Sequence, residues 1–145
     1  MARLFKFSLA GLLLVFSLPF IASAENMDDY MVKIYGGLAD IVERNINSPE
    51  RCVIETEGFI KKNQALIDKM HQTIKQNIQR AQSREYSEEE VQAMQQGYQG
   101  MAASKGSQQM NRFVQAVQNF SANNPDFEEK LGDAMVQLQS QGMGF

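Results

Sequence analysis

The feature that most constrains the fold is a proline-free stretch from Glu50 to Glu85, in which apolar residues recur at every third or fourth position. That spacing places them on one face of an α-helix. The stripe consists of Cys52, Thr56, Phe59, Ile60, Asn63, Leu66, Ile67, Met70, Ile74, Ile78 and Ala81. The sequence therefore predicts one helix over residues 49–84, roughly 50 Å long, with Ser48 as N-cap and Pro49 in its first turn.

The same periodicity predicts three further helices, and turn-forming residues separate them. They cover about residues 28–46, 88–121 with a kink near 104–107, and 125–140, followed by a frayed tail from about 141. Ser87 and Glu90 have capping-box spacing at the start of the third helix, and Gly106 weakens the pattern inside it. No alternating run of β-branched residues predicts a strand. The predicted fold class is all-α, an antiparallel bundle of four helices joined by short loops.

The first 24 residues have the order of a secretory signal peptide. Arg3 and Lys6 precede an apolar run from Phe7 to Ile21, and Ala22-Ser23-Ala24 supplies an A-x-A cleavage site. A membrane-spanning helix needs about 20 apolar residues, so a retained anchor is the less favoured alternative. We expect cleavage after Ala24, which leaves residues 25–145 as a single helical-bundle domain. The style of the signal indicates export to the periplasm of a bacterium.

The charge balance argues against two classes of partner. Without Arg3 and Lys6 the chain has 12 Lys and Arg against 17 Asp and Glu, a net charge of −5. Nucleic acids and anionic membrane surfaces both require a basic footprint on the protein. No second apolar run approaches the length of a membrane span. We therefore expect a chain that binds no nucleic acid and is not embedded in a membrane after cleavage.

The unequal lengths of the predicted helices leave one end of the bundle with less cover. Around the first loop, residue n of the first helix lies level with about residue 95 − n of the second. Around the second loop, residue n of the second helix lies level with about 171 − n of the third. At the end opposite Cys52, about residues 71–100, the second and third helices then have only each other, which buries too little of their stripes.

Either the chain folds back at Gly106 and covers this end of the two helices, or this end contacts a protein partner or a second copy of the chain. We favour contact with another molecule. Methionines in such a surface adapt to several partners. The hypothetical contact residues are Met70, Ile74, Ile78, Val91, Met94, Tyr98 and Met101.

Cys52 is the only cysteine, and it has three interpretations. It is a buried structural thiol, half of an intermolecular disulfide, or a reactive thiol or metal ligand. In a continuous helix His71, the only histidine, would lie roughly 28 Å away, so a Cys–His dyad within one chain is excluded. We favour the buried thiol and expect no enzymatic activity.

His71 has a default interpretation as a half-buried or solvated histidine beside the stripe. The level relations also place it in one layer with Met27 and Met101, and imidazole and thioether groups are ligands for copper or a b-type haem. The sequence as a whole predicts an exported, non-enzymatic interaction or chaperone-like accessory module. The alternative is a small carrier of copper or haem b.

Overall fold

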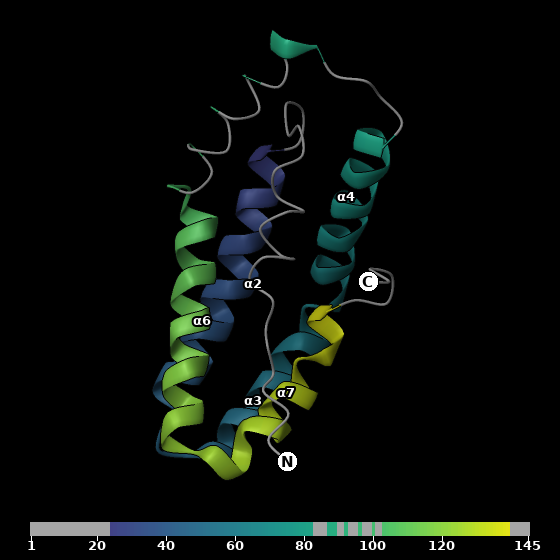
Figure 1. The fold of residues 1–145 in the computed structure, drawn as a ribbon. Coiled ribbons are helices and arrows are strands. Elements are labelled where there is room, and N and C mark those ends of the chain that lie inside the picture. The colour runs from purple at the N-terminus through teal and green to yellow at the C-terminus, as the bar shows by residue number, and fades with distance from the viewer. Residues whose placement is uncertain are drawn as a thin grey trace.

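The computed structural model describes residues 24–82, 87–89, 92, 96, 100 and 103–139 (Figure 1). The described residues form α-helices and short 3-10 helices, with no strand among them. The elements are α2 (Ala24–Arg44), α3 (Pro49–Lys62), α4 (Gln64–Gln82), α6 (Lys105–Asn123), η1 (Pro125–Phe127), α7 (Glu128–Ala134) and η2 (Val136–Gln139). The all-α prediction is thus confirmed for this part of the chain. The predicted signal peptide, up to residue 23, lies outside it, as does most of 83–102.

Helices α2 and α6 form the most extensive helix pair and lie side by side along their lengths (Figure 1). They run in the same direction, because bonds near both ends join residues that are 78 positions apart. Near the start, the Asp28 Oδ1 accepts a hydrogen bond from the Gly106 amide at 2.7 Å. At the end, the Asn124 Nδ2 donates to the Ile46 carbonyl at 2.8 Å.

An ion-pair cluster ties the middle of the α2–α6 pair together. Arg112 of α6 donates from Nη2 to Asp40 at 2.7 Å and from Nε to Glu43 at 2.8 Å, both on α2. Gly106 lies inside α6, where a Cβ would come within 2.8 Å of the Met31 Cβ. The lack of a side chain at Gly106 therefore lets the start of α6 approach α2 closely.

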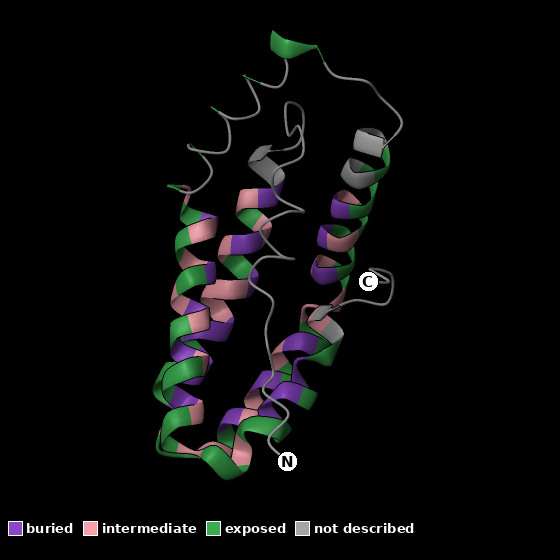
Figure 2. Ribbon diagram, viewed as in Figure 1, coloured by how far each residue is buried: buried purple, intermediate pink, exposed green. Residues whose placement is uncertain are grey.

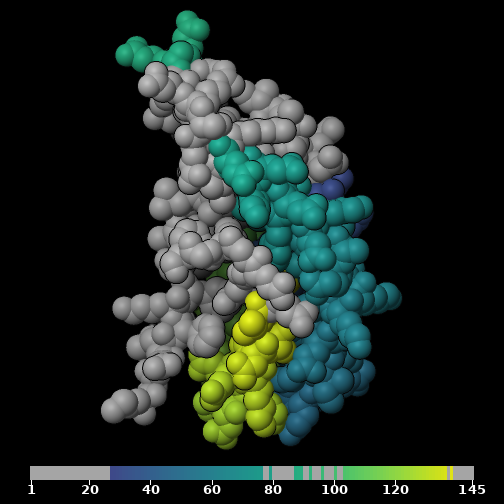
Figure 3. Space-filling model, turned by 90° about the vertical axis from the view of Figure 1, so that its right-hand side faces the viewer, coloured from purple at the N-terminus to yellow at the C-terminus, as the bar shows by residue number. Residues whose placement is uncertain are grey.

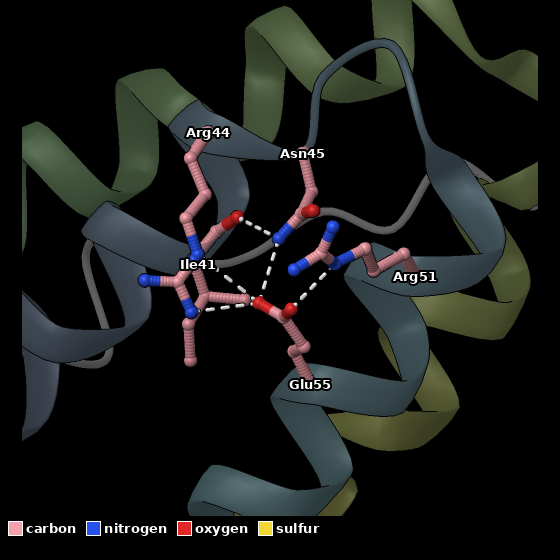
Figure 4. A network of polar contacts seen from close by, with 5 residues as sticks. All are labelled: Ile41, Arg44, Asn45, Arg51 and Glu55. Atoms are coloured by element: carbon pink, nitrogen blue, oxygen red, sulfur yellow. Dashed lines mark hydrogen bonds and ion pairs between the residues drawn. The ribbon is translucent and has the colours of Figure 1, made fainter.

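The corner between α2 and α3 is fixed by Glu55 (Figure 4). Its carboxylate accepts hydrogen bonds from Arg44 Nη2 at 2.7 Å, Arg51 Nε at 2.7 Å and Asn45 Nδ2 at 2.9 Å. Asn45 is buried and also donates to the Ile41 carbonyl. These donors, led by Arg44, lower the pKa of Glu55 to about 2.

The single predicted helix over residues 49–84 is wrong, because the chain breaks at Asn63 between α3 and α4. The Asn63 backbone amide bonds to the carbonyls of Phe59 and Ile60 at 3.0 and 3.2 Å, and its Nδ2 donates to the Phe59 carbonyl at 2.8 Å. A side-chain amide that bonds the preceding turn competes with the helical ladder. The Asn63 carbonyl then accepts from the amides of the next turn, where α4 begins.

The third and fourth predicted helices also differ from the observed elements. The predicted kink near 104–107 is the start of a helix: Ser104 is the N-cap of α6, and its hydroxyl accepts from the Ser107 amide at 3.2 Å. The fourth prediction, 125–140, is divided into η1, α7 and η2, with Pro125 in the first turn of η1. Figure 3 shows α7 packed against α3.

The core lies between α2 and the helices around it, where the buried faces meet (Figure 2). Its main cluster takes side chains from α2, α3, α4, α6, α7 and the residue after α7. These are Met27, Met31, Ile34, Leu38, Ala39, Val42, Cys52, Ile60, Ile67, Met70, Ile74, Met110, Phe113, Ala116, Phe120, Leu131 and Met135. Met31, Ile34, Leu38 and Val42 recur at helical spacing and form the buried face of α2.

Candidate functional site

The predicted contact surface falls only in part within the described residues. Met70 and Ile74 lie on the inner face of α4, with 2% and 6% of their surface exposed, and belong to the main core cluster. Ile78 lies in α4, but its side chain is outside the described set. The other predicted contact residues, Val91, Met94, Tyr98 and Met101, are outside it altogether. The structure therefore brings Met70 and Ile74 together, packed within their own chain.

Helix α4 is strongly amphipathic along the stretch that leads to this surface. On its inner face the exposed fraction rises toward the C-terminal end, from 0% at Ile67 to 6% at Ile74. The outer face is polar and exposed at Lys69, Gln72, Lys75 and Gln76. This apolar stripe packs toward α2, which α4 contacts. The helix is thus held to the core by one narrow apolar face.

His71 is half-buried on α4 and has a partner that the sequence does not indicate. Its Nε2 lies 3.0 Å from the backbone carbonyl oxygen of Leu138 in η2. A carbonyl can only accept, so Nε2 carries the proton in this contact. His71 thereby joins α4 to the last described turn of the chain. This bond engages one of the two ring nitrogens that could bind a metal.

The proposed metal-binding set is not assembled by the described residues. Met27 is buried in the core on α2, and Met101 lies outside the described residues. Within the described ranges, no three His, Cys, Asp or Glu side chains are grouped as a metal site requires. The copper or haem interpretation stays a prediction that no described contact supports.

Cys52 is a free thiol that is buried completely in α3. Burial raises the pKa of Cys52 to about 11, and the nearby Thr56 hydroxyl, which acts in the opposite direction, does not offset this. The thiol is therefore protonated at neutral pH, and the thiolate is the form that attacks electrophiles or binds metals. This environment disfavours the thiolate in the folded state, while the intermolecular disulfide stays a prediction.

Sequence reasoning missed the roles of Glu55 and Asn63. Glu55 looks like one of several solvated carboxylates, yet it joins α3 to the end of α2 through Arg44 and Asn45 and also bonds Arg51 within α3 (Figure 4). Its i,i+4 spacing from Arg51 was a usable signal for one of those contacts. Asn63 belongs to the stripe that predicted one continuous helix, but it is the C-cap at which α3 ends.

No helix in the described part of the chain combines the length and apolarity needed to cross a bilayer. Comparison of the chain with protein-family models, with curated protein sequences and with solved structures finds no match.

Proposed function

We propose that the protein is an exported, non-enzymatic interaction or chaperone-like accessory module that binds a protein partner through the helical hairpin between Met70 and Met101. The observation that carries this proposal is the apolar stripe of α4. It is buried from Ile67 to Ile74 and continues in the sequence to Ile78. In the resting chain the partner would contact the stripe from Ile78 onward, because Met70 and Ile74 are packed inside.

The chemistry of the remaining candidate residues supports a binding role over catalysis. The Cys52 thiol is buried and protonated, and the His71 Nε2 is bonded to the Leu138 carbonyl. Cys52 is buried in the core on α3, whereas His71 is half-buried on α4. Both side chains make contacts that stabilise the fold. Methionine and isoleucine on one helical face suit adaptable apolar contacts with another protein.

The proposal is tested by replacing Ile78 and Met94 with glutamate in one variant. We expect the variant to lose association, because two charges would enter an apolar interface, while its helical circular dichroism stays near that of the parent. Association is measured by native mass spectrometry of protein crosslinked in the exported fraction. The control is the Gln72→Glu, Gln76→Glu variant, which adds the same charge to the exposed outer face of α4.

Two results would contradict the proposal. If the Ile78→Glu, Met94→Glu variant unfolds, these side chains belong to an ordinary core. If both variants lose association equally, net charge is responsible and not the apolar stripe. Uptake of copper or haem by the purified protein, abolished by His71→Ala, would favour the carrier function instead.

A further inference from the structure

The helices differ in how firmly polar contacts fix them. Helix α6 is joined to α2 near its start, in its middle and just beyond its end, through Asp28–Gly106, Arg112 and the Asn124 amide. Helix α3 is joined to the end of α2 through Arg44 and Asn45, which both donate hydrogen bonds to Glu55. These contacts link separate elements, so they resist relative movement of α2, α3 and α6.

Helix α4 lacks such fixation along its described side chains. Two side-chain hydrogen bonds, from Gln64 to Asp68 and from Thr73 to the Lys69 carbonyl, stay within the helix. Among the described side chains of α4, the bond from His71 to Leu138 is the one polar link to another element. Apart from it, apolar packing of the inner face, at Ile67, Met70 and Ile74, holds α4 in place.

The N-terminal end of α4 is also a natural pivot. Asn63 is the single residue between α3 and α4, and the joint retains the bonds from its amide to the Phe59 carbonyl and from the Ile67 amide to its own carbonyl. A break of this kind concentrates φ and ψ changes in one or two residues and leaves both helices intact. Movement about Asn63 would displace α4 from α2 without disturbing the Glu55 corner.

From these three features we infer that α4 is a hinged cover, which pivots at Asn63 and is latched by the bond between His71 and the Leu138 carbonyl. Opening exposes the inner face of α4, including Met70 and Ile74, and the methionines Met27 and Met31 that share the core cluster with it. The inference rests on the proposed function in one respect: it makes opening the step that extends the binding stripe from Ile78 back to Ile67. In the closed state the stripe from Ile67 to Ile74 is buried, so a partner cannot contact it.

The test compares the oxidation of two methionines by hydrogen peroxide in the purified protein, read by peptide mass spectrometry. Met110, on the firmly anchored α6, is 7% exposed, whereas Met70 on α4 is 2% exposed. Static exposure therefore predicts that Met110 reacts first. A hinged α4 predicts the reverse, with Met70 reacting at least about fivefold faster through local opening.

The latch is tested by His71→Leu, which removes the donor. We expect Met70 oxidation to rise by about fivefold, the equivalent of one ordinary hydrogen bond, with no change at Met110. His71→Gln should restore the parent rate, because its amide nitrogen can donate to the same carbonyl. Gln72→Leu, at an exposed neighbouring position, is the control and should leave both rates unchanged.

Equal oxidation of Met70 and Met110 in the parent protein would overturn the inference, as would a parallel rise of both in His71→Leu. If His71→Leu does not fold, the hinge is tested by amide hydrogen exchange of the parent protein. The hinge requires the amides of α4 to exchange faster than those of α6, and equal protection of the two helices refutes it. None of these measurements needs a partner. These measurements can therefore refute the hinge while the Ile78→Glu, Met94→Glu experiment supports the binding function, and they can support the hinge while that experiment contradicts the binding function.

Discussion

Replacing Gly37 with alanine tests whether α2 and α3 approach as closely as the structure shows. A Cβ at Gly37 would lie 2.5 Å from Cε2 and Cζ of Phe59, a half-buried ring that packs against the core. Ordinary carbon–carbon contact is about 3.5–4.0 Å, so the ring must retreat by about 1 Å or more. Overpacking of this kind costs about 1–3 kcal/mol.

That steric cost is partly offset by helix propensity, because alanine is better than glycine in a helix interior by about 1 kcal/mol. The free energy of unfolding of Gly37→Ala should therefore fall by up to about 2 kcal/mol. Gly58 provides the matched control: it lies in α3, and a Cβ there would find nothing within 4 Å. We expect Gly58→Ala to stabilise the fold by about 0.5–1 kcal/mol.

Both variants are measured by urea denaturation followed by circular dichroism. The difference between their free energies of unfolding isolates the steric cost, since the gain in propensity is common to both. If Gly37→Ala is as stable as Gly58→Ala, the Phe59 ring moves aside freely, and the close α2–α3 contact has no energetic weight. If Phe59→Leu added to Gly37→Ala recovers stability, the clash is assigned to the ring.

Two further predictions follow from the titrating groups. The low pKa of Glu55 means that its bonds stabilise the fold above about pH 4.5 and that this contribution is lost as the pH falls toward 2. In urea melts at a series of pH values, Glu55→Gln should be less stable than the parent at neutral pH, and its free energy of unfolding should change less between pH 4.5 and 2. The control Glu57→Gln, at an exposed position, should show the same pH dependence as the parent. Cys52 should react with a thiol reagent only after denaturation at neutral pH, since it is buried and protonated, and a dimer band on non-reducing electrophoresis of freshly purified protein would contradict this.

The offset between α2 and α6 is close to that of the two level relations, although the continuous second helix on which they relied is not present. Those relations count residues around two turns at a fixed helix rise. The two level relations together place the first and third helices about 76 residues apart. The observed bonds, Asp28 with Gly106 and Ile46 with Asn124, join residues separated by 78.

The break at Asn63 could not be predicted in the same way. Asparagine is only mildly unfavourable inside a helix, and its side chain ends the helix only when it bonds the backbone of the preceding turn. The partner of His71 was equally hidden, because it is a backbone carbonyl 67 residues away. A carbonyl has no residue-type signal in a sequence.

Gly106 shows how one residue type supports two interpretations. Its position after Ala102-Ala103-Ser104 was consistent with a kink or stop, which is the usual effect of glycine in a helix. In the structure it packs where a side chain would collide with the Asp28 carboxylate and backbone. Only the location of the neighbouring helix distinguishes these two cases.

The pairing of α2 with α6 affects how the chain reaches its folded state. A polypeptide is made from its N-terminal end, so α2 emerges long before α6, which begins only at Lys105. Until then the side chains of Ile34 and Leu38 have no α6 to bury them. Contacts between residues so far apart in the sequence slow folding and prolong the exposure of apolar surface. A newly made chain would therefore need protection from aggregation until its last third is delivered.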